Sequence, residues 1–193
     1  MSDGIYLVLD MENDLVHADG PNGKAAFGEQ VRARRIIENT RRAIDKARTA
    51  GLRIGFVRVG FSPDYRECPP NSPIFSGARK NGVFKLGEWG TQVHPDLGQQ
   101  PGDFDIVKHR VSPFYATALE AILRAHGIRR IYCSGISTNA VVQATVRDGH
   151  DRDYEVVVLE DCCCALSAEE HAAAMDNLKR FCTITTSDQV AFA

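Results

Sequence analysis

Residues 131–143 read IYCSGISTNAVVQ and combine three structural signals in one short stretch. The apolar run at 131–133 predicts a buried strand, Ser134 and Gly135 predict a tight turn, and the amphipathic pattern from Thr138 onward predicts the start of a helix. In an open parallel sheet, a turn of this kind lies at the carboxyl ends of the strands, where ligands bind. The stretch therefore predicts both a fold class and the location of a site.

The rest of the chain alternates between the same two periodicities. Apolar runs predict strands at 5–9, 54–59, 105–107, 131–133, 156–159 and 181–185, and helical periodicity predicts helices at 30–50, 115–126, 138–151 and 167–179. Ser167 followed by Glu170 has the spacing of a capping box at the start of the last helix. We therefore predict a single domain over residues 1–193 with a three-layer, Rossmann-like α/β fold. Its six parallel strands are expected in the order 3-2-1-4-5-6, with helices on both faces.

The composition excludes several classes of protein. The chain is 44% hydrophobic and 25% charged, which is typical of a globular domain, and its net charge of -2 gives no reason to expect nucleic acid or an acidic membrane as a partner. It has no signal-peptide pattern and no apolar run of membrane-spanning length, so we expect a soluble, cytoplasmic protein. Its six cysteines lack paired metal spacing, which indicates reduced and mostly buried thiols.

Three positions follow predicted strands at the edge where ligands bind. Asp10 ends the first strand, Lys108 follows the third, and residues 136–141 follow the fourth. Taken alone, an Asp after a strand usually caps a turn and a Lys is usually a solvated charge. Residues 60–104 form a long, proline-containing connection, and a loop of that length usually builds or covers a site.

Several motifs along the chain resemble those of one enzyme family. They are the segments LDMEND at 9–14, KHRVSPF at 108–114, GISTNAVV at 135–142 and TVRDG at 145–149, followed by VLED at 158–161 with His171 downstream. In order and spacing they are similar to the motifs of the isochorismatase-like cysteine hydrolases, whose turn is typically Gly-x-x-Thr-x-x-Cys-Val. Gly135, Thr138 and Val142 match that turn, whereas Val141 stands where the attacking cysteine belongs.

The resemblance implies roles for individual residues. Asp10 and Lys108 would be two members of a Cys-Asp-Lys triad, with Asp10 as general base and acid and Lys108 orienting it. A cis peptide between Ile136 and Ser137 would let the N–H groups of Ser137 and Val141 face a developing oxyanion. No cofactor is implied. The histidines of the metal-binding nicotinamidase branch do not occur after the second strand, so no metal is expected.

Further expectations concern the pocket, the histidines and the partners. Asn13, Phe61, Trp89 and Phe114 are candidate pocket residues, although the aromatic rings would equally suit packing under the long loop. We expect His150 and His171 on helix surfaces. The resemblance implies a small-molecule substrate and a homo-oligomer, either a dimer or a tetramer.

The valine leaves the chemistry open between several alternatives. The leading hypothesis is a metal-independent hydrolase that cleaves an amide or carbamoyl C–N bond, or an enol ether, of a small molecule. It would use water activated by Asp10, or Asp10 as general acid, together with Lys108 and the backbone oxyanion hole, and no cysteine nucleophile. A nucleophilic role for Cys68, Cys133 or one of Cys162–Cys164 is less favoured, because no activating base is evident beside them. The alternative function is an inactive family member that binds a small ligand or a related subunit. The sequence disfavours a nucleotide-binding function, because no Gly-x-Gly-x-x-Gly motif follows the first strand.

Overall fold

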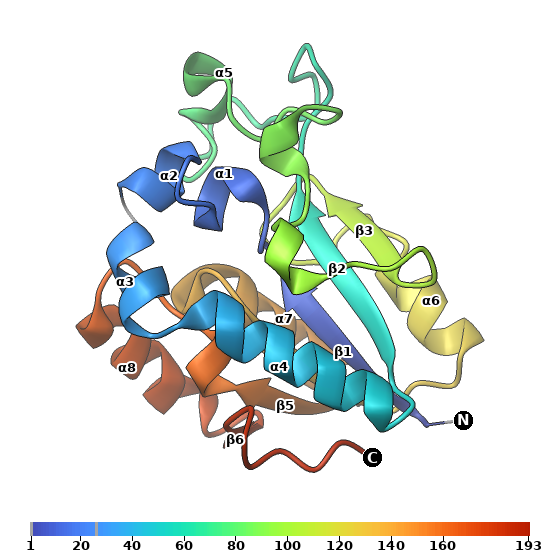
Figure 1. Ribbon diagram of the computed structural model, residues 1–193. Helices are drawn as coiled ribbons and strands as arrows, with labels where there is room; N and C mark the ends of the chain where they lie inside the picture. Colours follow the sequence, from blue (N-terminus) through green and yellow to red (C-terminus); the bar gives the residue numbers. More distant parts are fainter. Residues whose placement is uncertain (1, 26) are drawn as a thin grey trace.

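The computed structural model describes residues 2–25 and 27–193, and a parallel sheet forms its centre (Figure 1). The strands are β1 (Gly4–Leu9), β2 (Arg53–Val59), β3 (Phe104–Lys108), β4 (Arg130–Gly135), β5 (Glu155–Leu159) and β6 (Thr183–Thr185). They lie in the order β3-β2-β1-β4-β5-β6, and every neighbouring pair is parallel. The predicted sheet is confirmed. The strand order reverses between β1 and β4, so a crevice is expected beyond the ends of those two strands.

Helices connect the strands and cover the sheet. The α-helices are α1 (Asn13–Val16), α2 (Pro21–Lys24), α3 (Gly28–Ala33), α4 (Ile36–Thr49), α5 (Ala78–Asn81), α6 (Leu119–Ala125), α7 (Gln143–His150) and α8 (Ala168–Leu178). Shorter helical turns are η1 (Trp89–Thr91), η2 (Pro95–Leu97), η3 (Thr138–Val142) and η4 (Glu160–Cys162). None of the helices in residues 2–25 and 27–193 has the length and apolarity needed to cross a membrane.

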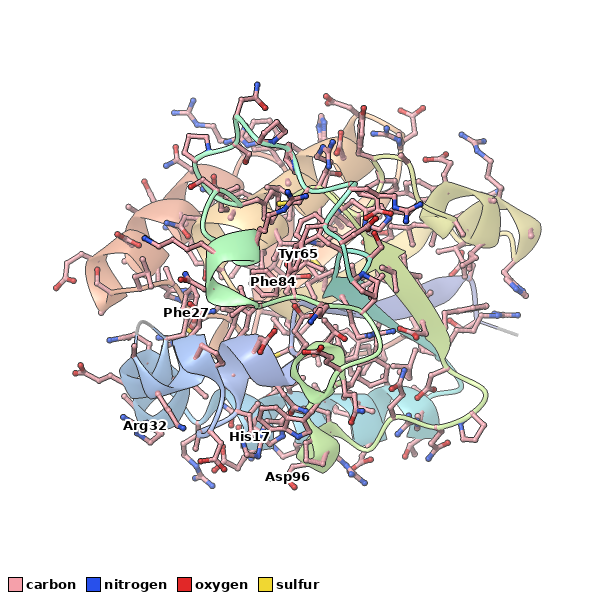
Figure 2. All side chains as sticks on the ribbon, turned by 90° about the horizontal axis from the view of Figure 1, so that it is seen from above. His17, Phe27, Arg32, Tyr65, Phe84 and Asp96 are labelled. Carbon is pink, nitrogen blue, oxygen red and sulfur yellow. The ribbon has the colours of Figure 1, made fainter. Side chains whose placement is uncertain are left out.

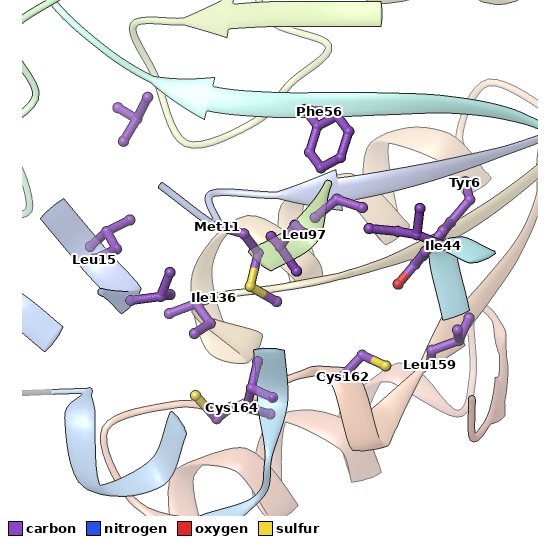
Figure 3. Packing of buried hydrophobic residues seen from close by; sticks show 14 of the residues in the cluster. Tyr6, Met11, Leu15, Ile44, Phe56, Leu97, Ile136, Leu159, Cys162 and Cys164 are labelled. Atoms are coloured by element: carbon purple, nitrogen blue, oxygen red, sulfur yellow. The ribbon is translucent and has the colours of Figure 1, made fainter. Parts of the chain in front are cut away.

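Alternate residues of the strands supply two separate apolar clusters. Tyr6 and Val8 of β1 pack on one face of the sheet with Ile44 of α4, and part of this cluster is drawn in Figure 3. Ile5, Leu7 and Leu9 pack on the other face of the sheet. There α6, α7 and α8 contribute apolar residues that include Leu123, Val146 and Leu178. Successive strand residues point to opposite faces, so the continuous apolar run of β1 is buried on both sides. The three layers follow from this pattern.

The helix predicted over residues 30–50 is two helices, α3 and α4. Arg35 between them has a φ of 53°, in the left-handed region, which breaks the helical path. Arg34 turns inward there, and its guanidinium donates hydrogen bonds to the carbonyl oxygens of Cys163 and Glu160, each at 3.0 Å. These hydrogen bonds therefore link the junction of α3 and α4 to the segment that follows β5.

Two other element boundaries differ from the prediction, and one capping motif is confirmed. The helix predicted from Tyr115 begins only at Leu119, because the Thr117 hydroxyl accepts a hydrogen bond from the Leu119 N–H at 3.1 Å and Ala116 has a φ of 53°. Strand β6 is shorter than the predicted 181–185. At the start of α8 the Ser167 hydroxyl accepts a hydrogen bond from the Glu170 N–H at 3.2 Å, as the capping box predicts.

The long connection between β2 and β3 folds over the carboxyl edge of the sheet. Its two halves pair with each other near β2, where the Phe61 N–H donates to the Phe84 carbonyl at 2.7 Å. The Asp14 carboxylate accepts a hydrogen bond from the Phe84 N–H at 2.6 Å, which links the connection to α1. The connection therefore supplies walls above the crevice at the end of β1, at the top of Figure 1.

Candidate functional site

Asp10 and Lys108 meet at the carboxyl edge of the sheet. Asp10 directly follows β1 and Lys108 is the last residue of β3, so the lysine side chain spans the width of β2 to reach the carboxylate. The Lys108 ammonium donates to Asp10 Oδ2 at 2.9 Å and to the Arg110 carbonyl oxygen at 3.1 Å. Both side chains are almost completely buried. The result is one buried ion pair with its two charges held in contact.

Burial dominates the electrostatics of Asp10. Removal from water raises the pKa of the Asp10 carboxyl above its ordinary value, and the attraction of Lys108 only partly opposes that rise. The second carboxylate oxygen, Oδ1, is buried and has no hydrogen-bond partner among the described residues. Asp10 therefore combines a raised basicity with one oxygen that is free to accept a proton.

The turn after β4 brings its backbone to the same place. Gly135 ends β4 with a φ of 154°, and a Cβ added at this position would lie 2.1 Å from the Leu9 carbonyl oxygen, so only glycine fits. The peptide between Ile136 and Ser137 is cis. The Thr138 N–H donates to the Cys164 carbonyl at 2.9 Å, which fixes the turn to the neighbouring segment.

Val141 occupies the first helical turn after this bend. It lies in η3, is 2% exposed, and packs in the apolar cluster behind the sheet. Its carbonyl oxygen accepts a hydrogen bond from the Thr145 hydroxyl of α7 at 2.7 Å, which links this π-helical turn to the α-helix that follows. The valine is thus well accommodated by its surroundings.

A cavity of about 380 Å³ opens above these groups. Asp10, Lys108, Ile136, Ser137 and Val141 all form part of its wall. The remaining lining residues come from α1, α2, the long connection and their neighbours: Leu15, Pro21, Asn22, Phe27, Val59, Ile74, Phe75, Gly77, Ala78, Asn81, Val83, Phe84, Val111 and Ala140. Figure 2 looks onto this end of the molecule and labels two of these lining residues, Phe27 and Phe84. The ion pair and the turn therefore share one pocket.

The four predicted pocket residues lie outside these walls, which corrects the prediction. Phe61 is fully buried against Phe75 under the connection, with ring centroids 5.5 Å apart. Phe114 packs on Tyr154 behind the sheet. The Asn13 amide donates to the Trp89 carbonyl at 2.9 Å, and Trp89 itself lies 44% exposed beside His17. Other residues, among them Phe27, Phe75 and Phe84, line the cavity instead.

His171 is buried, contrary to the expectation that it lies on a helix surface. One ring nitrogen, Nδ1, lies 2.8 Å from the Thr138 hydroxyl, and the other lies 3.2 Å from the Glu160 carboxylate. Arg34 contacts the same carboxylate at 2.6 Å. The hydrogen bond from His171, together with Arg34, lowers the pKa of Glu160. This chain of contacts supports the turn from α8, whereas His150 is exposed as predicted.

Glu12 is a second buried carboxyl, which the sequence reasoning missed. It is fully buried, and neither of its carboxylate oxygens has a hydrogen-bond partner among the described residues. Burial, reinforced by the nearby negative charge of Asp10, raises the pKa of Glu12 well above its ordinary value. The base of the site thus holds two carboxyl groups and one ammonium group.

The sequence matches the model of the Isochorismatase domain over residues 5–189. That match covers nearly the whole chain. The chain belongs to the isochorismatase family of hydrolases.

Four known proteins are similar to this chain in sequence or in fold. The chain is 34% identical over 169 residues to the ureidoacrylate amidohydrolase RutB of Methylorubrum extorquens AM1, which covers 81% of this chain and 68% of the relative. It is 37% identical over 167 residues to RutB of Yersinia enterocolitica, with 80% and 72% coverage. N-carbamoylsarcosine amidase from Thermoplasma acidophilum superimposes with a TM-score of 0.75 at 25% identity, covering 97% and 98% of the two chains. An isochorismatase family protein from Desulfovibrio vulgaris, 21% identical, has a TM-score of 0.85 and shares the fold, with 97% and 96% coverage.

The cysteines of this family member are unsuited to replace a nucleophile at position 141. No cysteine belongs to the described wall of the cavity. Burial raises the pKa of the Cys164 thiol to about 12 and also raises the pKa values of Cys133, Cys162 and Cys163. The Cys68 thiol lies under the connection and donates to the Phe75 carbonyl at 3.6 Å. A thiol must ionise and reach the substrate to attack it, so these groups act as packing.

The described residues also contain no cluster of three or more His, Cys, Asp or Glu side chains arranged to hold a metal ion.

Proposed function

We propose that this protein hydrolyses an amide or carbamoyl C–N bond of a small molecule with a water molecule as the nucleophile. The names of the relatives support the bond type, because two are amidohydrolases of a ureido compound and one is an amidase of a carbamoyl compound. The observation that carries the mechanism is the pairing of a buried Asp10–Lys108 ion pair with a hydrocarbon at position 141, all in one cavity wall. The site has a base and no attacking side chain.

In the proposed reaction, Asp10 Oδ1 takes a proton from the attacking water. The water oxygen forms a bond to the carbonyl carbon, and the carbonyl oxygen becomes an oxyanion. The N–H groups of Ser137 and Val141 stabilise that charge, and they are backbone groups that the change to valine leaves in place. The protonated Asp10 then gives its proton to the leaving nitrogen, the C–N bond breaks, and the carboxylate is restored.

Lys108 has a separate part in this scheme. Its ammonium group holds Oδ2 at 2.9 Å, so Oδ1 is the oxygen that remains to accept the proton. It also limits the rise in the pKa of Asp10 that burial causes, which keeps the carboxyl ionised often enough to act as a base. Lys108 is therefore a positioning residue for Asp10.

The second candidate function is binding of a small ligand without turnover, and Val141 is the observation that favours it. Asp10 and Lys108 argue against it. A buried ion pair with one oxygen left without a hydrogen-bond partner contributes little to the binding of an apolar ligand and is costly to bury.

The test is a panel of small amides, ureas, carbamates and enol ethers, with release of ammonia or amine as the readout. We expect turnover of C–N substrates that survives alkylation of the protein by iodoacetamide. Loss of that turnover on alkylation, or a thioester adduct seen in the intact mass during reaction, would show that a cysteine attacks and would overturn the water mechanism. Ligand-induced thermal stabilisation with no turnover of any compound would favour the binding function.

A further inference from the structure

The chemical character of the cavity wall restricts the substrate of the proposed reaction. Apart from Asp10 and Lys108, the described lining residues offer only two amide side chains, Asn22 and Asn81, and the hydroxyl of Ser137. The others are apolar residues or glycine. Neither an arginine nor a histidine belongs to the part of the wall that the structure describes.

The cation that is present is already engaged. Lys108 is 1% exposed, and its ammonium group donates to Asp10 Oδ2 and to the Arg110 carbonyl oxygen. The guanidinium of Arg110, the nearest arginine in the sequence, donates to the carbonyl oxygens of Glu67 and His109 and does not line the cavity. A carboxylate entering this pocket would therefore lose its hydration without gaining a cationic partner from the described wall, which is costly.

The charges beneath the cavity reinforce this conclusion. Asp10 and Lys108 cancel each other, and Glu12 adds a third ionisable group, fully buried and without a hydrogen-bond partner among the described residues. The sum is neutral when Glu12 is protonated and negative when it is ionised. Neither state attracts an anionic substrate.

Part of the exposed wall of the cavity is apolar as well. Ile74 from the long connection belongs to the wall and is 58% exposed, and Phe27 lines the same opening. An exposed isoleucine beside a pocket is suited to contact an apolar substituent of the substrate.

We propose that the cavity selects uncharged amides, ureas or carbamates with a compact apolar substituent, and rejects analogues that carry a carboxylate. This inference rests on the proposed function, since it names the substrate class of the same site. It separates this protein from its relatives, because an acrylate carries a carboxylate and two of the relatives are ureidoacrylate amidohydrolases. It also disfavours an enolpyruvyl ether as substrate, which carries a carboxylate on its reacting group.

Matched pairs of compounds that differ by one carboxylate test the inference. Isobutylurea and N-carbamoylvaline form one pair, and ethylurea and 3-ureidopropionate form another. Calorimetric titration of the intact protein measures the affinity for each compound, and ammonia release measures turnover separately. We expect each neutral compound to bind at least about tenfold more tightly than its acid.

The two readouts distinguish the failure of this inference from failure of the proposed function. Preference for the neutral compound without turnover leaves the inference standing and contradicts the proposed function. Turnover with equal or tighter binding of the acid leaves the proposed function standing and overturns the inference. Absence of binding by both neutral ureas at millimolar concentration overturns the inference too.

A variant of the cavity wall tests whether the lack of a counter-ion causes the discrimination against carboxylates. Asn81 lies at the exposed end of α5 and lines the cavity, so Asn81→Arg adds a cation to the wall with little demand on the core. We expect the ratio of acid to neutral affinity to rise by about tenfold relative to the matched Asn81→Gln control. An unchanged ratio in a correctly folded Asn81→Arg protein would contradict the claim that a missing counter-ion causes the discrimination.

Discussion

The two sides of the cavity base differ in how much chemistry they retain. On the β1–β3 side, Asp10 and Lys108 form a buried ion pair at 2.9 Å, which is costly to bury and is found where function requires it. On the β4 side, the turn keeps its backbone geometry while Val141 supplies only hydrocarbon. The contrast is between a buried pair of charges on one side and a hydrocarbon side chain on a fixed backbone turn on the other. The following predictions perturb one side or the other.

Replacement of Lys108 by methionine is expected to have the largest effect. It leaves the Asp10 carboxyl buried without its counter-ion, so we expect a loss of about 3–5 kcal/mol in the free energy of unfolding. Loss of Lys108 also raises the pKa of Asp10 further, so the acid limb of the activity profile should move to higher pH. Urea denaturation and the pH dependence of kcat/KM measure the two effects.

The exposed residue Lys80 provides the matched control for that variant. Lys80→Met should change both stability and activity little. If Lys108→Met behaved like Lys80→Met, the ion pair would have no role in either property.

On the turn side, Gly135→Ala is expected to destabilise the fold by about 2–4 kcal/mol. The added Cβ would collide with the Leu9 carbonyl oxygen at 2.1 Å, and the φ of 154° is strained for any other residue. Gly51→Ala, at a positive φ with open space around it, separates the conformational penalty from the collision. Equal destabilisation by the two variants, measured by chemical denaturation, would mean that the close approach at β1 is unimportant.

The contact between α8 and the turn after β4 should contribute less to the free energy of unfolding than Lys108 or Gly135 does. His171→Phe removes the hydrogen bond to Thr138 while filling much of the same volume, so we expect a loss of about 1–2 kcal/mol in stability. The matched variant Thr138→Val removes the other partner. A double-mutant cycle should show an interaction energy between the two positions. Strict additivity would contradict a direct link between them.

The smallest change in stability is expected from Glu12→Gln, which tests the electrostatics of the β1–β3 side of the cavity base. Because the pKa of Glu12 is raised in the folded protein, ionisation of this carboxyl destabilises the fold as pH rises above its ordinary value of 4.5. Glutamine cannot ionise, so the variant should match the wild type near pH 4 and become more stable at higher pH, by on the order of 1 kcal/mol. Thermal unfolding at several pH values, with exposed Glu29→Gln as control, checks this. A difference that does not grow with pH would mean that folding does not raise the pKa of Glu12.

The sheet order and the strand positions could be predicted from the sequence because apolar runs and helical stripes report burial directly. The pairing of Asp10 with Lys108, across β2, follows from the fold once the two residues are placed at strand ends. The cavity wall could not be predicted in this way. Phe61 and Phe114 are buried in the two apolar clusters, whereas Phe27, Phe75 and Phe84 line the cavity. Which aromatic residues face the cavity depends on how the segments around it fold, and the periodicity of the sequence does not report that.

The buried polar groups were missed for a related reason. His171 and Glu12 occur in segments whose periodicity does not distinguish an exposed polar residue from a buried one. Their environments depend on contacts with Thr138, Glu160 and Asp10, which are distant in the chain or set by the end of β1. Such contacts become visible only when the tertiary structure is assembled.

The most direct test of water attack by way of Asp10 is kcat/KM for the best C–N substrate in wild type and in Asp10→Asn, with Val141→Cys measured alongside. The account predicts measurable turnover by the wild type and a fall of about 10²–10⁴-fold in Asp10→Asn, since the asparagine amide cannot accept the proton of water. It also predicts that Val141→Cys acquires sensitivity to iodoacetamide that the wild type lacks. Undiminished turnover in a folded Asp10→Asn protein would contradict the account.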